Sequence, residues 1–178
     1  RPVLMFGHSF GGLVAFEVIR LLNQQGYRHP IALCVSAHCG PMYRTPVGAL
    51  HRLDDQALIE ELQRFDGVPA KLRSNEEYLA FCLPAIRADL RLDYQASLRM
   101  DCCLHQPLLV MAGNDDYVAP PELMYGWLNM TSGKSRFISW SGQHFYLRGQ
   151  LPTLIDRLTD FAREQWLLPS SELSQKTI

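Results

Sequence analysis

Val3-Leu4-Met5-Phe6-Gly7-His8-Ser9-Phe10-Gly11-Gly12 lies almost at the start of the chain and contains the pattern Gly-x-Ser-x-Gly. The apolar residues before the pattern are typical of a short buried strand, and the residues after it have the periodicity of a helix. Strand, sharp turn and helix form the setting of a nucleophile elbow, in which the turn exposes the serine hydroxyl. We therefore predict that Ser9 is a nucleophile. We also expect Gly7 and Gly11 to be glycines because a Cβ at either position would clash within the turn.

The remainder of the chain alternates between apolar runs and helix-like segments. Runs without polar alternation, joined by helices, predict parallel strands that are covered on both faces. The expected strands are residues 3–6, 31–37, 108–112 and 137–140, and the expected helices outside the central region are residues 13–22, 125–128 and 154–166. The sequence therefore predicts one α/β domain over residues 1–168, followed by a tail over residues 169–178.

A long segment without strand character separates the second and third expected strands. Helical spacing indicates short helices at residues 54–65, 75–82 and 93–98, broken by Gly67, Pro69 and Pro84. An insertion at this point of an α/β sheet lies above the carboxyl ends of the strands, where it can form a lid over a pocket. We expect a helical lid at about residues 52–101; the alternative is a helical decoration without a part in the chemistry.

Composition excludes several classes of protein. The 178 residues have a formal net charge of -1, which gives no reason to expect a nucleic acid or an anionic membrane as partner. No apolar run approaches the roughly 20 residues that span a bilayer. The five cysteines follow no metal-binding spacing, so we expect reduced thiols in a cytoplasmic protein and no metal site. The chain does not begin with Met, and an upstream targeting segment stays open.

Two further segments can complete a catalytic triad in the order serine, acid, histidine. The third expected strand runs into an acidic turn with Asp115 and Asp116, and the fourth runs into a loop with His144. These loops and Ser9 share one edge of a parallel sheet, so we predict that Ser9, Asp116 and His144 converge. Asp116 is preferred because it follows Gly113 at the spacing Gly-x-x-Asp, whereas Asp115 is the alternative. For His144, the alternative is an exposed loop histidine.

The other histidines have weaker contexts. His8 lies inside the elbow beside the nucleophile, where a packing role is expected rather than a role as base. The remaining histidines are expected to be structural or exposed: His29, His38, His51 and His105.

Four separate segments resemble one protein family. The elbow, the acidic turn from Gly113 to Val118 and the segment Gly142-Gln143-His144-Phe145 resemble those of type II thioesterases, which accompany polyketide and non-ribosomal peptide synthetases. Related medium-chain acyl carrier protein thioesterases share these features. The run Leu83-Pro84-Ala85-Ile86-Arg87-Ala88-Asp89-Leu90 is similar to the lid signature L-P-x-x-R-A-D of the same family. It is the most specific match, because other α/β-hydrolases share the elbow and acidic turn but not this run.

The resemblance implies an α/β-hydrolase fold and hydrolysis of acyl thioesters on the phosphopantetheine arm of an acyl or peptidyl carrier protein. Ser9 would attack the thioester, His144 would act as base, and the backbone N–H of Phe10 would help to form the oxyanion hole. No cofactor is implied beyond the arm of the partner, and we expect a monomer. Two alternatives stay open: an esterase or lipase acting on oxygen esters, and a catalytically silent module that binds acyl groups.

The chain differs from the family pattern in two respects. Tyr117 stands where many members have proline. The family fold also has several strands before the elbow, which supply the second oxyanion donor. We therefore expect these residues to be a fragment that lacks the N-terminal strands; the alternative is a degenerate product with little activity. The lid residues expected to line the substrate pocket are Phe81, Leu83 and Tyr94.

Overall fold

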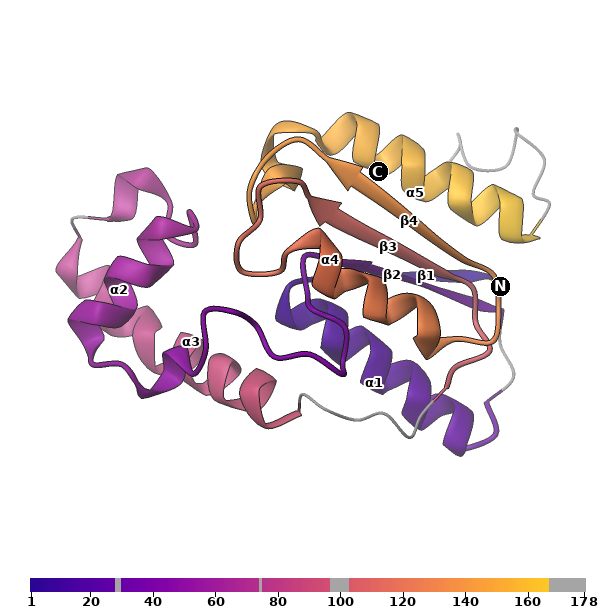
Figure 1. Cartoon of the computed structure of the whole chain (residues 1–178), viewed down its shortest axis with the longest axis horizontal. Coiled ribbons are helices and arrows are strands. Elements are labelled where there is room, and N and C mark those ends of the chain that lie inside the picture. The colour runs from indigo at the N-terminus through magenta and orange to yellow at the C-terminus, as the bar shows by residue number, and fades with distance from the viewer. Residues whose placement is uncertain (28–29, 74, 97–102, 167–178) are drawn as a thin grey trace.

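Four parallel strands form the centre of the computed structural model, which describes residues 1–27, 30–73, 75–96 and 103–166. The strands lie in the order of the sequence, β1 to β4, within one sheet (Figure 1). Their pairing is in parallel register throughout, and it confirms the parallel sheet predicted from the apolar runs. The strands are β1 (Val3–His8), β2 (Ile31–Ser36), β3 (Leu108–Gly113) and β4 (Ser135–Trp140).

Helices cover the sheet on both sides (Figure 1). Helix α5 lies on one face, while α1 and the turn that follows α4 lie on the other (Figure 1). The α-helices are α1 (Phe10–Gln24), α2 (Asp55–Arg64), α3 (Glu76–Ala96), α4 (Pro121–Met124) and α5 (Leu151–Trp166). Short 3-10 helices are η1 (Leu50–Arg52), η2 (Ala70–Leu72), η3 (Tyr125–Met130) and η4 (Tyr146–Gly149).

Strand β2 shows why the sequence lacks polar alternation. Leu33 and Val35 point into a core with α1, whereas Ala32 and Cys34 point into a second core with α5. Every residue of the strand is buried, so both faces must be apolar. The apolar runs of the sequence were therefore a sound guide to the strands.

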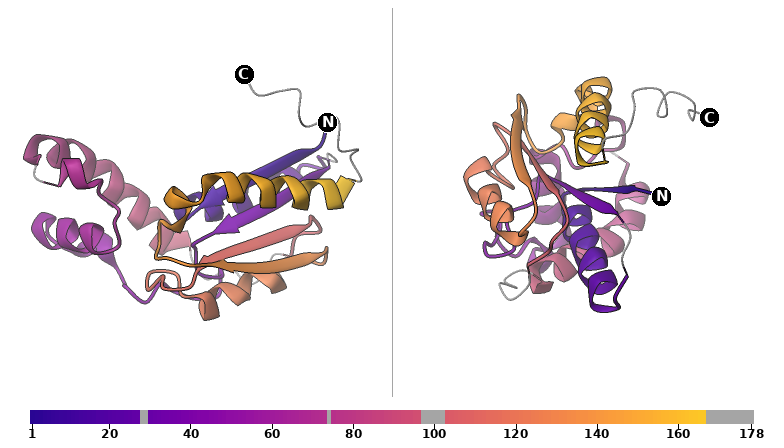
Figure 2. Two further views of the ribbon diagram at one scale, coloured as in Figure 1. Left: turned by 90° about the horizontal axis from the view of Figure 1, so that it is seen from above. Right: turned by 90° about the vertical axis from the view of Figure 1, so that its right-hand side faces the viewer.

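Helices α2 and α3 project beyond the end of the sheet toward which all the strands point (Figure 2). They enclose an apolar cluster of their own, which includes Leu58, Leu62, Phe65 and Leu83. This segment is helical, as the sequence predicted.

The prediction that Pro84 ends a helix is wrong, because α3 runs unbroken from Glu76 to Ala96. Proline removes one intrahelical hydrogen bond and normally destabilises a helix interior by about 3 kcal/mol. Here Pro84 and Ala80, whose carbonyl loses its partner, are both exposed, so that carbonyl is accessible to water. Burial of Leu79 and Leu83 on the opposite side holds the helix together.

Arg87 ties α3 to the start of the helical segment from η1 to α3, which corresponds to the predicted lid and is called the lid below. Its guanidinium donates hydrogen bonds to the carbonyls of His51 and Leu53 and pairs with Asp55. The arginine of the run Leu83–Leu90 therefore joins η1, α2 and α3.

Within the described residues, no helix is both long enough and apolar enough to cross a bilayer. Residues 97–98 of a predicted helix and the predicted tail lie outside the described residues.

Candidate active site

Ser9 occupies a strained turn between β1 and α1. Its φ of 53° and ψ of -132° lie in a region that residues with a Cβ rarely adopt. Two backbone hydrogen bonds hold the turn: the Ser9 N–H donates to the Ser36 carbonyl over 2.7 Å, and the Gly12 N–H donates to the Ser9 carbonyl over 2.8 Å. Strain of this kind persists only where surrounding contacts fix the backbone. The turn places Ser9 at the carboxyl end of the sheet.

Two glycines permit the close packing of this turn, but they are not the predicted pair. A Cβ on Gly7 would overlap the Gly11 carbonyl, and a Cβ on Gly12 would lie 2.9 Å from Val35 Cγ1. A Cβ on Gly11 would meet nothing within 4 Å, so the expected clash at Gly11 is wrong. Gly11 lies in the first turn of α1, where its Cα faces open space rather than β1.

His144 lies between Ser9 and Asp116. Its Nε2 is 3.0 Å from Ser9 Oγ, and its Nδ1 is 2.9 Å from Asp116 Oδ2. Both His144 and Asp116 are buried. Asp115, the alternative acid, is exposed, and the structure therefore brings together the preferred set of Ser9, Asp116 and His144.

Backbone contacts fix the orientation of the Asp116 carboxylate. Its Oδ1 accepts hydrogen bonds from the backbone N–H groups of Val118 and Ala119, so Oδ2 is directed at His144. A carboxylate at Nδ1 favours the tautomer in which Nδ1 carries the proton and Nε2 is free to accept one from Ser9. The acidic turn and the histidine loop also touch directly, since a Cβ on Gly113 would lie 2.6 Å from the Gln143 carbonyl oxygen.

Aromatic rings hold the His144 imidazole in place. The rings of His8 and Phe65 lie 5.3 Å and 5.5 Å from it, one from the elbow and the other from the lid. His8 Nδ1 is 2.9 Å from Ser36 Oγ, which is 2.7 Å from the hydroxyl oxygen of Tyr146. The packing role expected for His8 agrees with this position, but no sequence pattern connected Ser36 and Tyr146 with it.

His8 is neutral in this environment. Burial lowers the pKa of His8 to about 4, and the nearby His144 acts in the same direction. A neutral His8 adds no positive charge beside the His144 imidazole.

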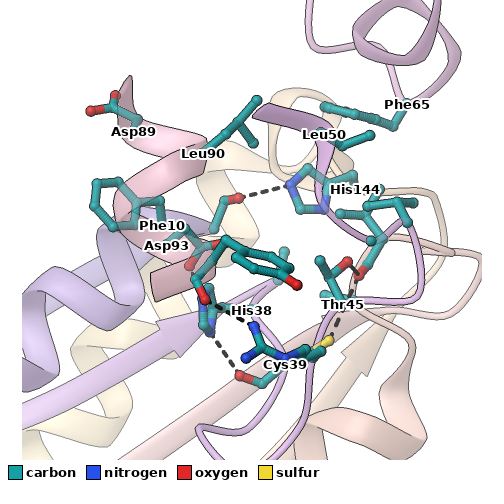
Figure 3. Close-up of a pocket in the computed structure, with 18 of the residues that line it drawn as sticks. Phe10, His38, Cys39, Thr45, Leu50, Phe65, Asp89, Leu90, Asp93 and His144 are labelled. Atoms are coloured by element: carbon teal, nitrogen blue, oxygen red, sulfur yellow. Dashed lines mark hydrogen bonds and ion pairs between the residues drawn. The ribbon is translucent and has the colours of Figure 1, made fainter. Parts of the chain in front are cut away.

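A cavity of about 290 Å³ begins at Ser9 and extends beneath the lid (Figure 3). Ser9 and His144 line one part of the cavity, with Phe10 beside them. Apolar and polar side chains from the lid and the strand ends complete its walls: Ala37, His38, Cys39, Tyr43, Arg44, Thr45, Val47, Leu50, Leu62, Phe65, Ile86, Asp89, Leu90, Asp93, Tyr94, Val118, Ala119 and Phe145. The site can therefore hold a partly apolar ligand against the serine hydroxyl.

Of the three lid residues expected in the pocket, only Tyr94 lines the cavity. The side chain of Phe81 is 84% exposed on the outer face of α3, and Leu83 is buried in the cluster between α2 and α3. The physical reason is the phase of α3, which directs Ile86, Leu90 and Tyr94 toward the cavity. That phase could not be read from a helix predicted to break at Pro84.

A hydrogen bond that the sequence did not predict joins the lid to the sheet. His38 Nε2, just after β2, is 2.7 Å from Asp93 Oδ1 on α3, and both residues line the cavity (Figure 3). The indole N–H of Trp127 donates to the His38 carbonyl over 2.7 Å. From its sequence context, His38 was expected only to be structural or exposed.

Phe10 is the first residue of α1, and its backbone N–H has no acceptor within the helix. That group, immediately after Ser9, is available to a ligand in the cavity. The described residues contain no group of three or more His, Cys, Asp or Glu side chains suited to a metal ion. Cys34 and Cys39 are buried, as expected of cysteines packed as apolar residues, whereas Cys103 is exposed.

Comparison with known proteins gives one family. A sequence profile of the thioesterase domain matches residues 1–162. The chain is 34% identical over 155 residues to Thioesterase PikA5 of Streptomyces venezuelae, covering 87% of this chain and 55% of that protein. It is 32% identical over 154 residues to Thioesterase TesA of Mycobacterium marinum, covering 86% and 61%. The chain thus spans little more than half the length of these relatives.

Solved structures give the same result. The type II thioesterase BorB from the borrelidin biosynthetic cluster is 32% identical with a TM-score of 0.81, and the match covers 92% of this chain and 66% of BorB. ClbQ from the colibactin pathway is 26% identical with a TM-score of 0.83, covering 93% and 70%. From the profile, the relatives and the shared fold, we conclude that this chain belongs to the thioesterase family and has the α/β-hydrolase architecture of type II thioesterases.

Proposed function

We propose that the protein is a serine thioesterase that hydrolyses acyl thioesters from the phosphopantetheine arm of an acyl or peptidyl carrier protein. The observation that carries the proposal is the chain of hydrogen bonds from Asp116 through His144 to Ser9, which ends inside the lid-covered cavity. A hydroxyl activated in this way, in a pocket with apolar walls, suits attack on a fatty or polyketide acyl group.

Acylation follows from the tautomer that Asp116 imposes. His144 Nε2 accepts the Ser9 proton while Ser9 Oγ attacks the thioester carbonyl, and Asp116 stabilises the resulting imidazolium. The carbonyl oxygen becomes an oxyanion, to which the Phe10 backbone N–H donates. As the tetrahedral intermediate collapses, the carbon–sulfur bond breaks and the pantetheine sulfur takes the proton from His144. The products are an acyl ester on Ser9 and a free thiol on the arm.

Deacylation uses the same groups with water in place of Ser9. His144 Nε2 accepts a proton from water, the hydroxide attacks the ester carbonyl, and the proton then passes to Ser9 Oγ. The acyl group leaves as a carboxylic acid. No redox step occurs, and His144 carries each proton transfer while the Phe10 N–H stabilises the oxyanion.

The relatives support a role beside a synthase. Their names include a gramicidin S biosynthesis protein and a thioesterase of the borrelidin cluster. By analogy, we propose that this enzyme removes or releases acyl groups held on the carrier protein of a polyketide or non-ribosomal peptide synthetase.

Hydrolysis of acyl-pantetheine thioesters and matched oxygen esters, measured side by side, tests the proposal. The thioester should be the better substrate, and Ser9→Ala or His144→Ala should lower kcat by more than roughly 1,000-fold. A preference for the oxygen ester would instead assign the site to an esterase. No turnover, together with no labelling of Ser9 by a serine-directed phosphonate, would show a silent acyl-binding module.

A further inference from the structure

Two guanidinium groups share one aromatic ring at the lid. The Arg44 guanidinium carbon lies 4.3 Å from the centre of the Tyr94 ring, and that of Arg52 lies 5.5 Å from it. The His51 ring is 5.0 Å from the same ring. Arg44 also donates a hydrogen bond to the Tyr94 carbonyl over 2.9 Å. The cluster is thus assembled from η1, the loop before it and the last turn of α3.

The positive charge of this cluster is not neutralised within the described chain. Arg44, Arg52 and Arg91 form no ion pair with a carboxylate of the described residues, and all three are exposed. Desolvation is the largest cause that lowers the pKa of His51, and the positive charges of Arg52 and Arg91 are the next largest. These arginines therefore create a positive potential at one place on the surface.

Acidic residues close to the cluster in the sequence or in the cavity are mostly engaged by other groups. Asp93 is engaged by His38, and Asp55 is engaged by Arg87. Asp89, one turn before Asp93 on α3, also lines the cavity and is exposed. Asp54, two residues after Arg52, caps α2 by accepting a hydrogen bond from the Ala57 N–H. Arg44 and Arg52 on the Tyr94 ring thus keep a positive charge that suits an anionic ligand.

The cluster continues the cavity that contains the nucleophile. Arg44 and Tyr94 line that cavity together with Ser9, whereas Arg52 lies outside its walls on the same aromatic ring. An elongated ligand with its reactive end at Ser9 can therefore place its other end among these arginines.

We propose that Arg44 and Arg52, which share the Tyr94 ring, form a phosphate site that binds the phosphodiester of the pantetheine arm while its thioester reaches Ser9. The proposal rests on the proposed function, which requires an arm with a thioester at one end and a phosphodiester at the other. Stacking against a ring holds a guanidinium in place along its flat face, and the N–H groups that are not already bonded stay available for hydrogen bonds to phosphate oxygens. The arm between its two ends is neutral, so the phosphate is the group through which the arm can form a strong electrostatic interaction.

The test compares acyl-pantetheine with acyl-4'-phosphopantetheine, two thioesters that differ only in the phosphate. We expect the unmodified protein to prefer the phosphorylated thioester by roughly tenfold in kcat/KM, mainly through a lower KM, because the phosphate is remote from the reacting carbon. Arg52→Gln and Arg44→Gln should each reduce that ratio by roughly three- to tenfold. The preference should also weaken as ionic strength rises.

Arg136→Gln provides the matched control. Arg136 is an exposed arginine at the start of β4, at the other end of the sheet from Ser9, and pairs with Glu164. Its substitution changes the net charge equally and should leave the ratio unchanged. The experiment is repeated with a loaded carrier protein and with acyl-coenzyme A, so that the tethered arm is distinguished from the free one.

Each outcome decides the proposal. A reduced ratio in both arginine variants, together with a higher KM for the loaded carrier, supports the site. Equal kcat/KM for the two thioesters in the unmodified protein would overturn it, as would variants that slow both thioesters equally and keep the ratio. A KM increase confined to coenzyme A would assign the arginines to the free arm and refute carrier recognition. Hydrolysis of neither thioester would refute the proposed function itself.

Discussion

Asp116→Asn removes a charge from the candidate triad while preserving the shape of the side chain. The hydrogen bonds around Asp116 indicate which way the new amide group would be oriented. The backbone N–H groups of Val118 and Ala119 both donate to Oδ1. If the new amide placed its NH₂ there, two donors in a buried position would lose their acceptor, at about 1–3 kcal/mol each. The carbonyl oxygen of the new amide should therefore keep those bonds, and its NH₂ group should face His144.

That orientation sets a donor against the Nδ1 proton of His144. The conflict is relieved when the proton moves to Nε2, but Nε2 then faces Ser9 Oγ as a donor and cannot accept the serine proton. Loss of the base by this route is expected to lower kcat by about 10⁴-fold, which corresponds to about 5 kcal/mol. The fold itself should be little affected, because the hydrogen bonds to the two backbone groups persist.

The assay is hydrolysis of an acyl-pantetheine thioester, with the midpoint of chemical unfolding as a check on folding. Asp115→Asn is the matched control, since Asp115 is adjacent but exposed, and its rate should stay within about threefold of the unmodified protein. If Asp116→Asn retained more than a tenth of the rate while Asp115→Asn was inactive, the assignment of the acid would be refuted.

Three other substitutions test separate parts of the structure. Gly7→Ala should destabilise the fold by several kcal/mol, because the new Cβ overlaps the backbone at Gly11. Gly11→Ala should be neutral or stabilising by up to about 1 kcal/mol, because its Cβ meets open space. Equal denaturation midpoints for the two variants would contradict the packing of the elbow. Burial lowers the pKa of His8 to about 4, so as pH falls the unfolded state binds a proton at His8 before the folded state does. The free energy of unfolding is therefore unaffected by His8 above pH 6.5 and decreases as pH falls toward 4. The decrease attributable to His8 is up to about 3 kcal/mol and should be absent in His8→Asn. If the free energy of unfolding of His8→Asn had the same pH dependence as that of the unmodified protein, the lowered pKa of His8 would be refuted. Leu83→Ala should cost about 2–5 kcal/mol and Phe81→Ala less than about 0.5 kcal/mol, as measured by urea unfolding; a reversed order would show that the phase of α3 is wrong.

The strands and the triad could be predicted from sequence because their signals are local. Strands β2 and β3 are apolar runs in which every residue is buried. Each candidate catalytic residue lies in the turn or loop that follows a strand. Parallel strands then bring Ser9, Asp116 and His144 to one edge without further information.

The lid could not be predicted in the same detail, because tertiary contacts override its local signals. Pro84 is a helix breaker by type, yet exposure of its turn and burial of Leu79 and Leu83 keep α3 continuous. An incorrect break also loses the phase of the helix, so Phe81 and Leu83 were expected in a pocket that neither of them lines.

Contacts between distant segments were out of reach for a different reason. Arg44 and Arg52 meet Tyr94 only after α3 folds back beside η1, and Ser36 meets Tyr146 across the sheet. No periodicity or motif links these positions along the chain. They can be found only from coordinates.

Under the proposed function, Ser9 becomes acylated by a thioester held on a carrier protein. The direct measurement is mass spectrometry of the protein, quenched rapidly after mixing with an acyl-loaded carrier protein and then digested. The peptide containing Ser9 should gain the mass of one acyl group, and Ser9→Ala should abolish both this adduct and turnover. An acyl group found on another residue, or turnover that survives in Ser9→Ala, would contradict it.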